Sequence, residues 1–122
     1  MSLSAASPLL LHNPRCSKSR AAKAWLDERG QPYTERLYLE DPLNSEELAE
    51  LGTLLGSPAS EWVRASESAY ESAQLSNDST QEELIQALST HPSLMQRPIV
   101  VNGTRAAIGR PLELVMELFE SR

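Results

Sequence analysis

Residues 9–39 read LLLHNPRCSKSRAAKAWLDERGQPYTERLYL and predict a strand, a helix and a second strand. The apolar run at 9–11 is short and ends at a turn-forming pair, which favours a buried strand. Residues 17–29 carry apolar side chains at helical spacing, and Gly30 provides a stop. Residues 33–39 are rich in strand-forming residues. A strand, a helix and a strand in this order form a βαβ unit, so the two strands are expected to be parallel.

The last quarter of the chain predicts two more strands and a helix. Residues 99–101 and 104–108 flank the pair Asn102-Gly103, which is a strong signal for a tight turn between antiparallel strands. The run Gly109-Arg110-Pro111 ends the second of these strands. Apolar residues at helical spacing across 112–119 then mark an amphipathic helix.

A helical block at about 44–90 separates these two halves. Asn44 with Glu47, and Ser79 with Glu82, resemble capping boxes that open helices. Pro58 before an apolar pair suggests a short helix between them. The order βαβ, helical insertion, ββα predicts an α/β, thioredoxin-like fold with a mixed sheet and helices on both faces.

Length and composition bound the architecture. The chain has 122 residues, which suits one domain spanning 1–122. Its 40% hydrophobic and 23% charged residues are typical of a soluble globular protein. Residues 1–7 are small and polar and are expected to be loosely ordered. We expect neither a membrane span nor a secretory signal, because no apolar stretch approaches roughly 20 residues and the start has no cationic n-region.

Charge and cysteine content exclude several classes of function. The net charge of −6 argues against general nucleic-acid binding, which needs clustered cations. The single cysteine excludes an intramolecular disulfide, so any redox reaction must borrow a second thiol. With no secretory signal, this composition suits the reducing cytoplasm. One cysteine, two histidines and scattered glycines also predict neither a metal cluster nor a glycine-rich phosphate loop.

Cys16 is the leading candidate for chemistry because it stands between the first predicted strand and the following helix. A helix N-terminus stabilises a thiolate and attracts an oxyanion. Arg15, Lys18 and Arg20 add positive charge close in sequence. This setting favours a reactive thiolate over an inert buried thiol.

Two neighbours of Cys16 have open interpretations. Ser19 lies three residues later, where a dithiol oxidoreductase would carry its second cysteine, and its hydroxyl could donate to the thiolate. It is equally compatible with a serine that bonds its own backbone. His12 either tunes the site or makes a structural hydrogen bond at the strand end.

Three arginines beside apolar or proline-bounded segments are candidates for binding an oxyanion. A guanidinium binds tetrahedral oxyanions in bidentate fashion, so three of them around one thiolate would form a phosphate-like anion site. The alternative is three unrelated arginines in salt bridges. A cis peptide bond before Pro98 would shape the wall of the thiol site, and the sequence leaves the cis and trans isomers open. The arginines are Arg64, Arg97 and Arg110.

Residues 12–20, 91–101 and 109–111 together resemble the glutaredoxin-dependent arsenate reductases, in the superfamily that also contains Spx-like regulators. The resemblance runs from about residue 10 to residue 119, and residues 57–78 contribute only Arg64 to it. It implies that Cys16 is the nucleophile toward arsenate. It further implies that Arg64, Arg97 and Arg110 bind the oxyanion, and that His12 and Ser19 lower the thiol pKa.

The resemblance also implies the partners of the reaction. These are arsenate or a similar oxyanion, glutathione as co-substrate and glutaredoxin, with no tightly bound cofactor. We expect a cytoplasmic monomer that binds neither nucleic acid nor membrane. One alternative is an Spx-like regulator that binds RNA polymerase, although Ser19 removes the Cys-x-x-Cys switch that such sensors commonly use. Another is a related thiol reductase with a different oxidant.

Overall fold

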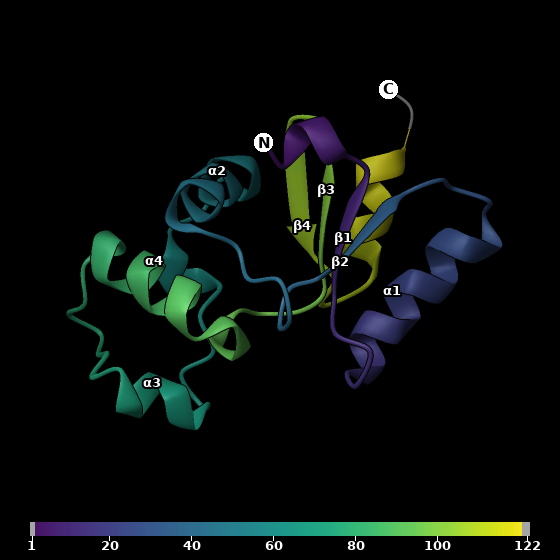
Figure 1. The fold of residues 1–122 in the computed structure, drawn as a ribbon. Coiled ribbons are helices and arrows are strands. Elements are labelled where there is room, and N and C mark those ends of the chain that lie inside the picture. The colour runs from purple at the N-terminus through teal and green to yellow at the C-terminus, as the bar shows by residue number, and fades with distance from the viewer. Residues whose placement is uncertain (1, 121–122) are drawn as a thin grey trace.

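A computed structural model describes residues 2–120 and contains one mixed sheet with the strand order β2-β1-β3-β4 (Figure 1). The first two strands are parallel, and β3 is antiparallel to both β1 and β4. This confirms the predicted α/β, thioredoxin-like fold class, with its βαβ and ββα halves. The strands are β1 (Leu9–His12), β2 (Thr34–Leu37), β3 (Ile99–Asn102) and β4 (Arg105–Ile108).

The α-helices are α1 (Ser17–Glu28), α2 (Ser45–Leu55), α3 (Ser68–Ser72), α4 (Gln81–Thr90) and α5 (Glu113–Met116). Four of the α-helices, α1, α2, α4 and α5, lie in predicted segments, and the insertion between β2 and β3 also contains α3, which was not predicted. Short 3-10 helices are η1 (Ser4–Ala6), η2 (Ala59–Glu61), η3 (Pro92–Leu94) and η4 (Glu117–Phe119). Within residues 2–120, no helix combines the length and apolar character needed to cross a membrane.

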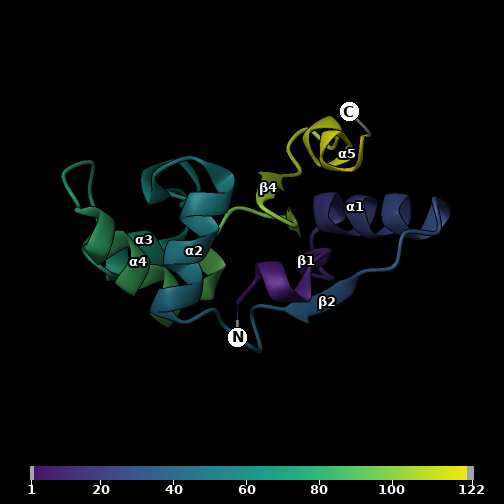
Figure 2. The ribbon, with the colours of Figure 1, turned by 90° about the horizontal axis from the view of Figure 1, so that it is seen from above.

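The sheet has a hydrophobic core on each face because successive side chains of a strand point to opposite sides. Leu10 packs with Leu26 of α1 beneath α5. Leu9 and Leu11 point the other way and join the core of the insertion, which contains the fully buried Trp62. Figure 2 accordingly shows α1 and α5 on one side of the sheet and α2 to α4 on the other.

The helix starts of the insertion follow capping chemistry, with one correction. Asn44 and Glu47 form the predicted capping box at α2. At α4 the prediction of Ser79 with Glu82 is wrong by one residue, because Thr80 and Glu83 form the box. Ser79 Oγ instead accepts a hydrogen bond from the N–H of Ser76 at 2.9 Å, in the turn before the helix.

This assignment predicts different stability losses for the two hydroxyl residues. Thr80→Ala is expected to lower the free energy of unfolding by about 1 kcal/mol, since an N-cap bond to the Glu83 N–H is lost. Ser79→Ala is the matched control and is expected to cost less. Urea denaturation of both variants tests which residue is the N-cap of α4. A larger loss of unfolding free energy for Ser79→Ala would contradict the assignment to Thr80.

The N-terminal segment differs from its prediction. Residues 1–7 were expected to be loosely ordered, but residues 2–7 contain η1, and Leu3 is buried. The Glu50 carboxylate of α2 accepts hydrogen bonds from the N–H groups of Leu3 at 2.6 Å and Ser4 at 3.2 Å. A distant carboxylate therefore satisfies the start of η1. Met1 of this segment lies outside the described residues.

Candidate active site

Cys16 is the N-cap residue of α1, directly after the loop that leaves β1. Its N–H donates to the Asn13 carbonyl at 3.0 Å, and its own carbonyl accepts the Arg20 N–H at 3.0 Å. The residue is 8% exposed and its thiol is free. The sulfur therefore stands at the positive end of a twelve-residue helix, at the edge of the molecule's interior.

The surroundings of Cys16 favour the thiolate. Burial raises the pKa of the Cys16 thiol, but the backbone N–H groups of Ser19 and Lys18 and the guanidinium of Arg97 oppose burial and lower the pKa overall. A lowered pKa increases the fraction of the nucleophilic form near neutral pH. The predicted reactive setting is therefore present around this sulfur.

This balance predicts how Cys16 titrates. The absorbance of the thiolate, measured as wild type minus Cys16→Ser, is expected to reach half its maximum below the ordinary value of about 8.5. The thiolate fraction at neutral pH is then larger than that of an ordinary cysteine, and it falls as pH drops through the lowered pKa. Titration at or above the ordinary value would show that burial dominates and would contradict the proposed balance.

Arg97 and Arg110 meet beside the sulfur because the β3–β4 hairpin brings its two ends together. Arg110 Nη2 lies 3.8 Å from Cys16 Sγ, and its Nε donates to the Arg97 carbonyl at 2.7 Å. Both arginines precede prolines through cis peptide bonds, so the isomer of Pro98 is cis. Gly109 packs against Pro98, where an added Cβ would lie 2.7 Å from Pro98 Cγ. This close approach requires glycine between the hairpin and the thiol site.

Arg64 reaches the same region through a separate backbone link. Val63 and Met95 form an isolated bridge, and the Arg64 N–H donates to the Leu94 carbonyl at 2.6 Å. The Arg64 side chain pairs with Glu67 at 3.4 Å. Among the described contacts it does not touch Cys16. The described contacts therefore bring Arg97 and Arg110, but not the Arg64 side chain, to the sulfur.

Ser19 and His12 form a buried pair behind the thiol. His12 Nδ1 and Ser19 Oγ lie 2.7 Å apart, and the N–H of Asn13 donates to Ser19 Oγ at 3.0 Å. Burial is the main cause of the lowered pKa of His12, with Lys23 and Arg20 adding to it against Glu35. The described hydrogen bonds do not include one from the Ser19 hydroxyl to the sulfur. Ser19 favours the thiolate through its backbone N–H, while its hydroxyl hydrogen-bonds with His12 and Asn13 at the end of β1.

Tyr38 is a further candidate for the site that the sequence reasoning did not name. It follows β2 just as the Cys16 loop follows β1, and parallel neighbours end at the same edge of a sheet. Its side chain is 1% exposed. Its hydroxyl makes no hydrogen bond to any residue in the described part of the chain. The parallel pairing of the two strands was the signal that could have identified it.

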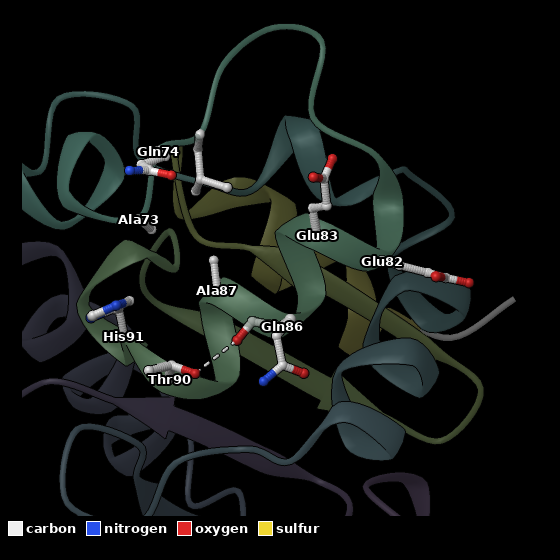
Figure 3. Close-up of a pocket in the computed structure, with 9 residues that line it drawn as sticks. Ala73, Gln74, Glu82, Glu83, Gln86, Ala87, Thr90 and His91 are labelled. Atoms are coloured by element: carbon white, nitrogen blue, oxygen red, sulfur yellow. Dashed lines mark hydrogen bonds between the residues drawn. The ribbon is translucent and has the colours of Figure 1, made fainter.

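A cleft lies in the insertion and is lined by none of the candidate residues around the thiol (Figure 3). Gln74, Glu83 and Thr90 line it together with His91, and Thr90 Oγ1 donates to the Gln86 carbonyl at 3.1 Å. His91 is the C-cap residue of α4. Across residues 2–120, no cluster of three His, Cys, Asp or Glu side chains could hold a metal ion.

Comparisons with known proteins show the family of the chain. The ArsC family model matches residues 11–118. The chain is 43% identical over 115 residues to a Haemophilus influenzae protein named arsenate reductase, covering 92% of this chain and 98% of that one. A solved structure of an arsenate reductase from Vibrio cholerae has a TM-score of 0.86 at 36% identity, covering 91% of this chain and 96% of the other. Bacillus cereus global transcriptional regulator Spx 1 is also similar, at 30% identity over 101 residues, covering 82% of this chain and 77% of that protein.

Proposed function

Because the chain belongs to the ArsC family, we propose that it reduces arsenate to arsenite with the Cys16 thiolate as nucleophile. The observation that carries the proposal is a thiol of lowered pKa at a helix N-terminus, 3.8 Å from an arginine Nη2. This arrangement combines a nucleophile with donors for an oxyanion. The names of the similar proteins support the same substrate class.

The proposed oxyanion site is built from fixed donors. Arg97 and Arg110 provide forks for two oxygens, and the first N–H groups of α1 add donors on the side of the sulfur. Arg64 completes the set when its side chain leaves Glu67. These groups concentrate positive charge in a chain whose net charge is −6. An anionic substrate is therefore drawn to the one region where a nucleophile is also present.

The first chemical step forms a sulfur–arsenic bond. The Cys16 thiolate attacks arsenic, one arsenate oxygen takes up protons and leaves as water, and arsenic stays in its +5 state. The arginines and the helix N-terminus offset the negative charge that two anions bring together. The lowered pKa of Cys16 supplies the thiolate without a separate general base.

The second step requires an external thiol, since Cys16 is the only cysteine of the chain. Glutathione attacks the Cys16 sulfur and forms a mixed disulfide. The electron pair of the sulfur–arsenic bond remains on arsenic, which leaves as arsenite in the +3 state. Glutaredoxin then accepts the glutathionyl group and restores the Cys16 thiol. No tightly bound cofactor enters this cycle, and the reducing cytoplasm supplies its thiols.

The test is arsenate-dependent NADPH oxidation in an assay coupled through glutathione, glutaredoxin and glutathione reductase. Turnover that requires arsenate, glutathione and Cys16 is the expected result. Absence of turnover in folded protein with reduced Cys16 would overturn the proposal. Omitting glutaredoxin while keeping glutathione separates the reduction of the mixed disulfide from the two chemical steps that precede it.

An Spx-like regulator is the second candidate, favoured by the 30% identity to Spx 1. Ser19 stands where the second cysteine of a Cys-x-x-Cys switch would be, so this chain lacks that switch. Retention of a purified RNA polymerase core on the immobilised protein, together with failure of the coupled assay, would favour the regulator. Turnover with another oxidant but not with arsenate would point instead to a related thiol reductase.

A further inference from the structure

Tyr38 carries a buried hydroxyl that the proposed reaction does not yet use. The side chain is 1% exposed, and the hydroxyl has no hydrogen-bond partner among the described residues. Buried hydroxyls in folded proteins are ordinarily paired, so an orphaned one indicates a partner that binds. The Nε of Arg97 is buried and unpaired in the same way.

The Tyr38 hydroxyl lies within the electrostatic reach of the thiol site. Burial raises the pKa of Tyr38 to about 12, with Arg97 and Arg64 lowering it and the Cys16 thiolate raising it. The Asn13 side chain also lowers the pKa of Tyr38 through a hydrogen-bonding contact, although no bond between the two side chains meets ordinary hydrogen-bond geometry, and the Asn13 amide oxygen already accepts the N–H of Arg15 at 3.0 Å. The phenol therefore stays neutral at physiological pH and feels the charges of the nucleophile and of two candidate anion-binding arginines.

A neutral hydroxyl offers chemistry that the arginines lack. A guanidinium can only donate hydrogen bonds, whereas a hydroxyl both donates and accepts. Near neutral pH, arsenate and phosphate keep at least one hydroxyl group, which needs an acceptor. A site made of arginines and backbone N–H groups leaves that proton without a partner.

We propose that the Tyr38 hydroxyl hydrogen-bonds directly to the oxyanion held at Cys16, so that Tyr38 is a substrate-binding residue. The inference rests on the proposed function for the identity of the anion, but the contact itself concerns any protonated tetrahedral oxyanion. Tyr38 and Arg97 together supply the two buried polar atoms that lack partners in the described structure. One bound oxyanion beside Cys16 would satisfy both.

Tyr38→Phe tests this contact because it removes one oxygen and keeps the buried ring. The half-saturating concentration of arsenate is expected to rise about ten-fold, with the turnover number changing far less, since a contact made before and during reaction is lost. Urea denaturation is expected to show no loss of stability. Tyr33→Phe is the matched control, because the Tyr33 hydroxyl is bonded to Lys23 and Asp27 and lies at the other end of β2.

A second readout does not depend on turnover. Inorganic phosphate is expected to slow the alkylation of Cys16 by iodoacetamide in the wild type, and Tyr38→Phe is expected to need about ten-fold more phosphate for the same protection. If Tyr38→Phe needs more phosphate for protection but the wild type does not reduce arsenate, the contact is supported and the proposed function is rejected. Equal protection and equal half-saturation in both proteins would overturn the contact while leaving the proposed function intact. Phosphate that protects neither protein, together with unchanged half-saturation, would also overturn it.

Discussion

Replacing Cys16 by serine is expected to reduce arsenate-dependent NADPH oxidation to the background of the assay without protein. A serine hydroxyl stays protonated at neutral pH, whereas the environment at the start of α1 lowers the pKa of the thiol. The same N–H groups and Arg97 cannot ionise a hydroxyl. Serine also cannot form the disulfide that releases arsenite, so both chemical steps fail.

The Cys16→Ser variant is expected to fold normally. Serine is close in size to cysteine and is a favoured N-cap residue, which suits the extended conformation at the start of α1. Ser17→Ala is the matched control, because Ser17 is the adjacent residue and is exposed. Glutathione-dependent arsenate reduction that survived in Cys16→Ser, with normal urea denaturation, would show that the nucleophile is assigned wrongly.

Much of the sheet could be predicted from the sequence because its signals are local. The turn at Asn102-Gly103 joins two adjacent strands, and Gly103 takes the positive φ of 65° that such turns require. Gly30 and Gly56 likewise adopt positive φ angles where α1 and α2 end. Each of these features depends on neighbouring residues, which are all that a single sequence displays.

Features that depend on distant contacts could not be predicted in the same way. Glu50 orders the segment at Leu3 and Ser4 across more than forty positions, which composition alone does not reveal. The start of α4 was predicted from Ser79 with Glu82, whereas Thr80 with Glu83 forms the observed cap. Only the turn at Ser76 decides between them, because it occupies the Ser79 hydroxyl.

The candidate site shows the same division. The location of Cys16 at a helix start followed from the order of local elements, and the hairpin brings Arg97 and Arg110 together. The direction in which a side chain points was not accessible. The Ser19 hydroxyl pairs with His12. The parallel pairing of β1 and β2 places Tyr38 at the sheet edge from which the Cys16 loop leaves. The roles assigned to these residues in catalysis stay predictions.

Arg97→Ala is expected to lower kcat/KM for arsenate by about 10²–10³-fold, the cost of removing one donor from an oxyanion site. Two losses act together. The guanidinium no longer binds the anion, and the pKa of Cys16 rises because Arg97 is one of the groups that lower it. The thiolate titration is therefore expected to move to higher pH in this variant. Arg97→Lys keeps the positive charge and loses the bidentate donor geometry of the guanidinium group.

Stability is expected to change little in Arg97→Ala, which separates a binding role from a structural one. Arg97 Nε has no partner in residues 2–120, and the carbonyl that receives the Arg110 Nε is retained by alanine. Arg105→Ala is the matched control, since Arg105 is exposed on β4 and the Leu118 carbonyl keeps its bond from Asn102. An unchanged thiol titration with unchanged arsenate kinetics in Arg97→Ala would remove Arg97 from the site. A kinetic loss matched by an equal loss in Arg105→Ala would attribute the effect to net charge rather than to a built anion site.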